Sequence, residues 1–154
     1  MERNGAGKIC MNEIKVFFDS NVLVYVIDDR WPDKQKIAID LVKKSINAGN
    51  GNISTQSLQE FYNVATKKLS CSKENAKNYL ENFSKVFDVE QVSVNHILKA
   101  VDISIKTQFS FWDSLILAAA SQSGCLVLYS EDLNDSQIVD GVKIVNPFTS
   151  TQGL

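Results

Sequence analysis

Four acidic side chains lie where the chain passes between predicted elements of secondary structure. Asp19 follows an apolar run at 15–18, and Asp132 follows another at 125–129. Glu60 and Asp113 lie in the first turns of two predicted helices. If folding gathers these carboxylates without a counter-charge, repulsion raises their pKa values, so a divalent cation is the expected partner. Because oxygen ligands alone select a hard ion, the pattern predicts a Mg²⁺ or Mn²⁺ site.

Each acid also has an ordinary structural interpretation. Asp19 could cap the helix that follows it, and Asp113 could fill the third position of a capping box with Ser110. Glu60 lies opposite the apolar stripe of its helix and could be a solvated surface residue. Asp132 could be a turn residue. The joint placement of the four acids, rather than any one of them, favours the metal site.

The elements that must position these acids alternate between strand and helix. Strands are predicted at 15–18, 52–55, 91–94, 125–129 and 143–145. Helices are predicted to begin at about 21, 32, 56, 72, 96 and 110. Parallel strands need crossover connections, so this order predicts a three-layer αβα sandwich with a short central parallel sheet. In such sheets ligands bind outside the carboxyl ends of the strands, which is where the acids fall.

Two helices carry more detailed predictions. The helix that opens at Ser110 is apolar nearly all round and should be central, and its Phe111 and Trp112 are expected in the core, with base stacking as the alternative. The helix that begins near residue 96 is expected to bury a seam of apolar side chains. The seam consists of Ile97, Val101 and Ile105.

Composition limits the class of protein. The chain has 154 residues, 44% of them hydrophobic, and a net charge of −2, which suits one domain at 13–150 after a polar tail at 1–12. Three cysteines without a CxxC pair and one histidine predict neither a zinc site nor a disulfide scaffold. No apolar run reaches the roughly 20 residues of a membrane span, and no signal peptide is recognisable, so a cytoplasmic location is expected.

The charge pattern provides no overall basic field, so any nucleic-acid site must be local. Lys67 and Lys68 follow Glu60 on the outer face of its helix and are candidate phosphate contacts. Four lysines on the preceding helix are weaker candidates and are expected to be solvated: Lys34, Lys36, Lys43 and Lys44.

Four segments in register resemble the PIN-domain family, in particular the VapC-type ribonuclease toxins of toxin–antitoxin pairs. They are FFDSNVLVYVID at 17–28, STQSLQEFYNV at 54–64, SFWDSLILAAA at 110–120 and LVLYSEDLND at 126–135. The resemblance implies an αβα sandwich, a Mg²⁺ or Mn²⁺ cofactor, cleavage of single-stranded RNA, a small antitoxin partner and a homodimer. Asp19, Glu60 and Asp113 match the three near-invariant acids of the family, and Asp132 matches the more variable fourth. Ser130 matches a hydroxyl residue that supports the site.

Within this resemblance we expect Asp19 and Asp113 to be the main metal ligands. Glu60 and Asp132 would complete the ligand shell, directly or through water, with Asn21 as a further supporting residue. One or two metal ions can supply what phosphodiester hydrolysis needs, so no nucleophilic side chain is required. His96, the only histidine, falls within a predicted helix and is expected to be packed or at the surface, which disfavours a histidine mechanism.

Two other protein classes place an acid after the first strand of an α/β sheet. A haloacid-dehalogenase-like phosphatase needs a second Asp two residues after Asp19, where this chain has Asn21, and a response-regulator receiver needs an acidic pair that is also missing. A housekeeping RNA-processing nuclease and a PIN-like domain that binds RNA or a protein without cutting both remain open. For the fourth acid we prefer Asp132 to Asp135, because the sheet still positions the backbone at Asp132.

Overall fold

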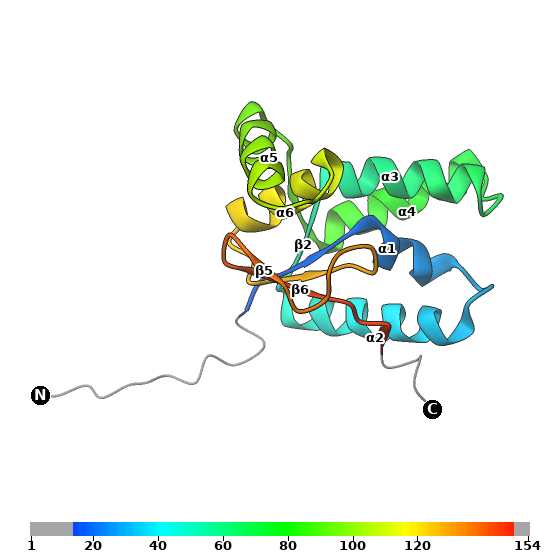
Figure 1. Ribbon diagram of the computed structural model, residues 1–154. Coiled ribbons are helices and arrows are strands. Elements are labelled where there is room, and N and C mark those ends of the chain that lie inside the picture. The colour runs from blue at the N-terminus through cyan, green and yellow to red at the C-terminus, as the bar shows by residue number, and fades with distance from the viewer. Residues whose placement is uncertain (1–13, 150–154) are drawn as a thin grey trace, which may run out of the picture.

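The computed structural model describes residues 14–149, in which helices cover both faces of a sheet (Figure 1). The strands are β1 (Val16–Phe18), β2 (Gly51–Ser54), β3 (Asp88–Glu90), β4 (Val127–Tyr129), β5 (Ile138–Val139) and β6 (Val142–Val145). The helices are α1 (Ser20–Ile27), α2 (Pro32–Ala48), α3 (Thr55–Lys67), α4 (Lys73–Val86), α5 (Val94–Lys106) and α6 (Phe111–Gln122). The tail predicted at 1–12 lies outside the described residues.

The sheet has the strand order β3-β2-β1-β4-β6-β5, and β1 lies near its centre. Val16 of β1 pairs in parallel with Gly51 of β2 and with Val127 of β4. The β2–β3 and β4–β6 pairs are also parallel, and only β5 runs antiparallel to its neighbour. The predicted three-layer αβα sandwich with a mainly parallel central sheet is therefore confirmed.

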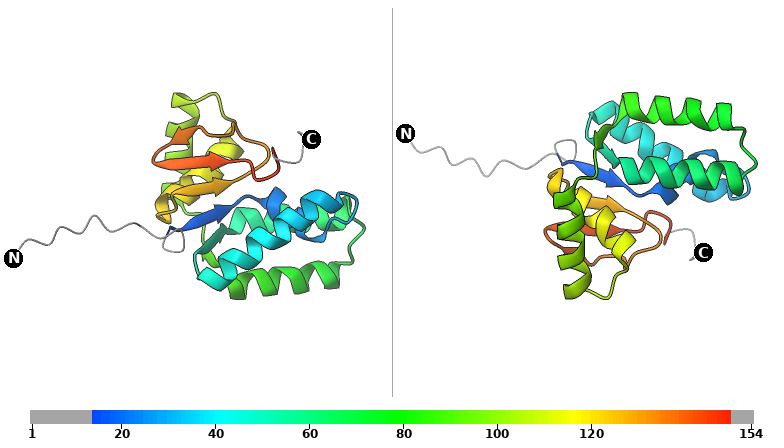
Figure 2. Two further views of the ribbon diagram at one scale, coloured as in Figure 1. Left: turned by 90° about the horizontal axis from the view of Figure 1, so that it is seen from below. Right: turned by 90° about the horizontal axis from the view of Figure 1, so that it is seen from above.

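Each face of the sheet has its own hydrophobic core. Phe17 belongs to the core formed with α5 and α6, whereas Phe18 belongs to the core formed with α1 to α4. Both rings are fully buried. Burial of one such side chain contributes about 1.5–3 kcal/mol, so the alternation along β1 helps to fix both helical layers. As predicted, α6 is central, and its side chains from Ser114 to Ala120 are all buried. Figure 2 shows the layers from below and from above.

Strand ends and helix starts coincide at the edge of the sheet that carries the strands' carboxyl ends. Asp19 follows β1 directly with extended backbone angles (φ −71°, ψ 158°) and is the N-cap of α1. Ser54 ends β2 and caps α3 by accepting a hydrogen bond from the Ser57 amide. Ser110 caps α6 in the same way, with the Asp113 amide as donor. Capping thus places polar side chains along this edge.

Two strand predictions need correction. The strand predicted at 91–94 is wrong, because the strand in this region is β3 at Asp88–Glu90. Ser93 instead precedes α5, and its amide donates to the ring of His96. Local capping therefore outweighs the β-propensity of the two valines. The short strand β5 was not predicted, since two residues are too few to form a readable pattern.

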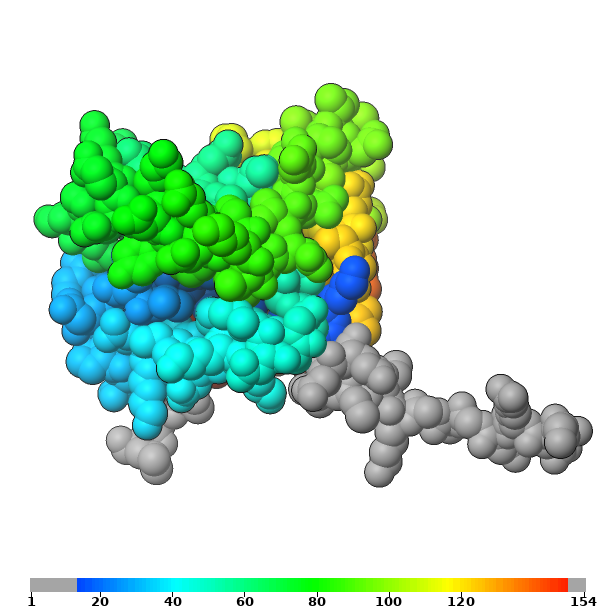
Figure 3. All heavy atoms as spheres, turned by 180° about the vertical axis from the view of Figure 1, so that it is seen from behind, coloured from blue at the N-terminus to red at the C-terminus, as the bar shows by residue number. Residues whose placement is uncertain are grey.

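The seam predicted on α5 is also wrong. Ile97, Val101 and Ile105 are 42%, 42% and 75% exposed, whereas His96, Ala100 and Ile103 form the buried side of the helix. Apolar residues lie on more than one face of α5, so their spacing alone does not show which face is buried, and the predicted seam falls on the exposed face. Since α5 packs mainly on α6, its other side forms one corner of the molecular surface (Figure 3).

No helix among residues 14–149 combines the length and apolar character that a membrane crossing would need.

Candidate active site

Asp19 lies at the centre of the candidate site. It is 5% exposed, and it accepts hydrogen bonds from the Ser20 amide at 2.7 Å and from the Ser130 hydroxyl at 2.8 Å. β1 delivers Asp19 and β4 delivers Ser130, so the parallel pairing of these central strands brings the two residues together. A buried carboxylate with two donors is held in one orientation.

The charge state of Asp19 reflects its surroundings. Its pKa is raised from 3.8 to about 7, chiefly by burial, while the hydrogen bonds from Ser130 and Ser20 act in the opposite direction. The charges of Glu60 and Asp132 contribute to this rise. Acids from α3 and from the loop after β4 therefore lie close enough to Asp19 to repel its negative charge.

Asn21 connects Asp19 to the loop after β4. Its side-chain amide nitrogen lies 3.0 Å from Asp132 Oδ2, 3.3 Å from Ser130 Oγ and 3.5 Å from Asp19 Oδ2. Its amide oxygen accepts from the Glu131 backbone N–H at 3.3 Å. This one side chain therefore holds Asp132 and the loop that carries it against the start of α1.

Glu60 is held by two neighbours that sequence reasoning did not single out. The Ser20 hydroxyl donates to its Oε2 at 2.7 Å, and the Gln56 amide donates to its Oε1 at 2.9 Å. Gln56 is 4% exposed and also donates to the Trp112 carbonyl at 3.1 Å. Gln56 precedes Glu60 by four residues, the spacing of neighbours on one helix face, which was the signal that could have identified it.

Asp113 completes the group of acids. Its pKa is raised, first by burial and then by the charges of Asp132 and Glu60, while its contact with Ser110 acts in the opposite direction. The Asp113 amide donates to Ser110 Oγ at 3.1 Å, which is one of the two hydrogen bonds of the expected capping box. The Asp113 backbone thus takes part in capping α6, while the charges of the other acids act on its carboxylate.

Asp135 and Asp132 have different surroundings. Asp135 accepts from the Asn146 amide at 2.8 Å, which ties its loop to the end of β6. The Asp132 amide instead donates to Ser130 Oγ at 3.2 Å, beside Asp19.

The residues considered as substrate contacts differ in their exposure. Lys67 and Lys68 are exposed at the end of α3. Lys34, expected to be solvated, forms an ion pair with Glu131 at 2.9 Å and is only 19% exposed. Trp112, expected in the core, is 64% exposed, because the fully buried part of α6 begins only at Ser114, whereas Phe111 packs partly against the core.

His96 is packed, as one of the two expectations had it. Its ring is buried and lies 2.7 Å from Ser93 Oγ and 3.1 Å from Glu90 Oε1. These contacts bind the start of α5 to β3.

The chemistry of the acid group suits a hard divalent cation. Asp19, Glu60, Asp113 and Asp132 offer carboxylate oxygens only, and each of the two raised pKa values has neighbouring acids among its causes. Across residues 14–149, no group of three or more His, Cys, Asp or Glu side chains is placed so that it could hold a metal ion together.

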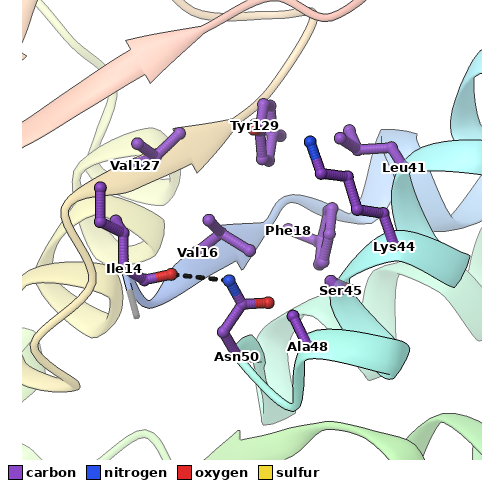
Figure 4. A pocket seen from close by; sticks show the side chains of 10 residues that line it. All are labelled: Ile14, Val16, Phe18, Leu41, Lys44, Ser45, Ala48, Asn50, Val127 and Tyr129. Carbon is purple, nitrogen blue, oxygen red and sulfur yellow. Dashed lines mark hydrogen bonds between the residues drawn. The ribbon is translucent and has the colours of Figure 1, made fainter. Parts of the chain in front are cut away.

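An apolar pocket of about 100 Å³ lies elsewhere, between α2 and the strands β1 and β4 (Figure 4). Phe18, Leu41 and Tyr129 line it, and Asn50 donates to the Ile14 carbonyl at its margin at 2.7 Å. None of the four acids lines it, so this pocket is separate from the candidate site.

The fold and the acids at its edge define the class of protein. A family model described as PIN domain matches residues 16–139. The chain therefore belongs to the PIN-domain family. Among curated proteins, none matches the chain.

Solved structures with the same fold include toxin–antitoxin complexes. The DNA-bound VapBC complex of Salmonella typhimurium has a chain that is 18% identical, with a TM-score of 0.64 over 85% of this chain and 96% of that one. A toxin–antitoxin complex from Klebsiella pneumoniae has a chain that is 20% identical, with a TM-score of 0.63 over 86% and 98%. VapC20 of Mycobacterium tuberculosis, described as a toxin that cleaves the sarcin–ricin loop, is 18% identical, with a TM-score of 0.58 over 77% and 90%.

Proposed function

We propose that this protein is a metal-dependent endoribonuclease that cleaves single-stranded RNA in the cytoplasm and is the toxin of a toxin–antitoxin pair. The observation that carries the proposal is the convergence of Asp19, Glu60, Asp113 and Asp132 at one edge of a PIN fold, with their charges coupled. The likeness to VapBC complexes and to an RNA-cleaving VapC toxin supports the toxin assignment.

The residues have separate roles in this proposal. Asp19 and Asp113 hold a Mg²⁺ or Mn²⁺ ion, with Glu60 and Asp132 completing the shell directly or through water. Such an ion, when bound, polarises a phosphoryl oxygen and lowers the pKa of a bound water. Glu60 has a hydrogen-bond donor on each carboxylate oxygen, so its orientation is fixed and it is suited to orient the attacking water. Ser130 and Asn21 hold Asp19 and Asp132 in place.

Two partners belong to the proposal. The first is a small antitoxin that occludes the acids, with an arginine as the complementary side chain. The second is another copy of this chain, which would cover the exposed side of α5. Five apolar residues lie exposed on that helix, and they are Val94, Ile97, Leu98, Val101 and Ile105. An apolar surface of this kind marks an interaction site more often than a free surface.

A cleavage assay tests the enzymatic part. Purified protein should cut a fluorogenic single-stranded RNA with Mg²⁺ or Mn²⁺ and not in excess EDTA, and Asp113→Asn should be inactive. Full activity in EDTA would contradict a metal mechanism. RNA binding without cleavage in either metal would favour the alternative of a non-cutting PIN-like domain.

A growth assay separates the toxin from a housekeeping nuclease. Expression of the wild type alone should slow growth, and Asp19→Asn at equal soluble levels should not. If cleavage is confirmed but both chains are equally harmless, the protein is an RNA-processing nuclease. A small gene immediately upstream whose product restores growth would identify the antitoxin.

A further inference from the structure

A groove leads away from the acids along α1. It has a volume of about 440 Å³, within the roughly 300–1,000 Å³ range of small-ligand sites, and Glu60 and Asp132 line part of it. Tyr25 of α1 lines it further along, and Arg30 and Trp31, in the loop between α1 and α2, line it beyond the end of the helix. The groove therefore joins the acid group to an exposed aromatic side chain at the other end of α1.

Trp31 is presented as a supported flat surface. Its side chain is 53% exposed, yet Lys34 Nζ lies over the indole ring, 5.4 Å from its centroid. Lys34 is itself held by Glu131 at 2.9 Å and by the Tyr25 hydroxyl at 3.2 Å. One ring face is thus backed by a fixed cation, so the indole itself loses little conformational freedom when a ligand stacks on it.

The charges along the groove are paired away from the acid group. Arg30 forms two hydrogen bonds with the Asp28 carboxylate, from Nε at 2.8 Å and from a terminal nitrogen at 2.9 Å. Glu131 is paired with Lys34. Paired charges and an aromatic wall suit an uncharged flat group better than a phosphate or a cationic peptide, while the phosphate belongs beside the acids and their ion.

We propose that this groove binds an RNA base close to the scissile phosphate, stacked on Trp31. Asn63, one turn of α3 after Glu60, also lines the groove and offers an amide to the edge of that base. The inference rests on the proposed function, because it takes single-stranded RNA as the ligand. Beyond that function, the inference specifies that the RNA extends from the acids along α1 and that Trp31 holds one of its bases.

Steady-state kinetics provide the first test. Trp31→Ala should raise KM for a single-stranded RNA by about tenfold with little change in kcat, the scale of one base–aromatic stack, and Trp31→Phe should restore most of the affinity. The Trp31 side chain makes no capping hydrogen bond to α2, so the melting temperature should change little. Leu126→Ala is the matched control. Leu126 is 48% exposed and directly precedes β4, so it lies at the amino end of that strand, away from the acids at the carboxyl ends.

A coupling experiment distinguishes stacking from a structural role. The Asp113→Asn and Trp112→Phe background prevents cleavage and leaves Trp31 as the sole tryptophan of the two in the chain. Its fluorescence should be quenched by a single-stranded RNA. In a series of oligonucleotides that each carry one abasic site, one position should weaken binding by about tenfold. In the Trp31→Ala variant, the abasic site at that position should have no further effect. The anisotropy of labelled RNA measures both affinities. Equal losses with intact and abasic RNA would contradict stacking.

The remaining outcomes separate this inference from the proposed function. If the wild type cleaves RNA and Trp31→Ala has an unchanged KM, the proposed nuclease function is supported and the proposal that the groove binds an RNA base is contradicted. If KM rises only for Trp112→Ala, the RNA base stacks near α6 instead, which also contradicts base binding in the groove. Quenching of Trp31 by RNA without any cleavage supports the groove and contradicts the nuclease. Unchanged RNA binding together with lost binding of a purified antitoxin would assign the groove to a protein partner.

Discussion

Asp19 combines a structural role with a chemical one, and the combination has a measurable effect on stability. Its carboxylate caps α1 and accepts from Ser130, yet burial and neighbouring acids disfavour its charge. The folded state is therefore more stable relative to the unfolded state when this carboxyl is protonated than when it is ionised.

For the metal-free protein we predict that stability falls as pH rises from about 4 through about 7, because the pKa of Asp19 is 3.8 when unfolded and about 7 when folded. Asp19→Asn should remove this part of the fall and melt higher than the wild type at pH 8 in EDTA, while losing cleavage. Thermal melts of both proteins at pH 5 and pH 8 provide the measurement. A lower melting temperature for the variant at pH 8 would mean that capping dominates.

Gln56 should act through Glu60 rather than on the substrate. Gln56→Leu removes both hydrogen bonds that join Glu60 to the Trp112 carbonyl, so kcat should fall by about tenfold or more, while KM changes little. Gln59→Leu, an exposed glutamine on the same helix, is the control and should keep full activity. Equal losses from both variants, or a KM effect alone, would argue against positioning of Glu60.

Asp132 and Asp135 can be separated by single substitutions. Asp132→Asn should weaken Mn²⁺ affinity or cleavage by about tenfold or more, because this side chain joins the acids through Asn21. Asp135→Asn should affect either quantity far less and should instead loosen the contact with Asn146. Mn²⁺ titration and RNA cleavage on both variants decide between them, and a larger loss from Asp135→Asn would place the fourth carboxylate there.

At the scale of elements, the loop after β4 is tied to α2 by an ion pair and to α1 by hydrogen bonds from Tyr25 and Asn21. Glu131 contacts Lys34 at 2.9 Å and Tyr25 at 3.2 Å, with exposures of 27% for Glu131 and 19% for Lys34. Together with the hydrogen bonds of Asn21, this pairing helps to keep Asp132 beside the acids even though the loop has no regular structure there.

Glu131→Gln should therefore lower the free energy of unfolding by about 1–3 kcal/mol, the scale of a hydrogen bond to a charged group that is partly shielded from water. Glu81→Gln breaks an exposed pair with Lys77 and should change stability by less than about 1 kcal/mol. Urea titrations of the three proteins compare the values. Equal effects would show that the loop is held by other contacts.

At the scale of the whole molecule, the exposed side of α5 is the feature that the monomer leaves unexplained. Leu98 is 59% exposed and Ile105 is 75% exposed on a helix whose opposite side is buried. A second copy would remove this apolar surface from water.

We therefore predict a dimer in solution that Leu98→Glu converts to a monomer. Light scattering after gel filtration measures the mass directly. Leu126→Glu, with a comparably exposed leucine outside α5, should leave the dimer intact. A monomeric wild type, or dissociation by both variants, would contradict the assignment of α5 as the interface.

The sequence determined the alternation of strands and helices and the positions of the acids, because capping residues and apolar runs are local signals. Pro32 marked the start of α2, and the nearly all-apolar stretch of α6 indicated its central place. These features depend on periodicity and backbone preference, which act within a few residues.

Which surfaces face each other depends on tertiary packing. The exposure of Ile97 and Trp112, the ion pair of Lys34, and the place of Gln56 between Glu60 and α6 all depend on how segments distant in sequence pack. On α5, several apolar faces compete, and a helix pattern carries no information about which one meets the sheet. The parallel pairing of β1 with β4 brings Asp19 to Ser130 across 111 positions, a distance at which no local signal in the sequence operates.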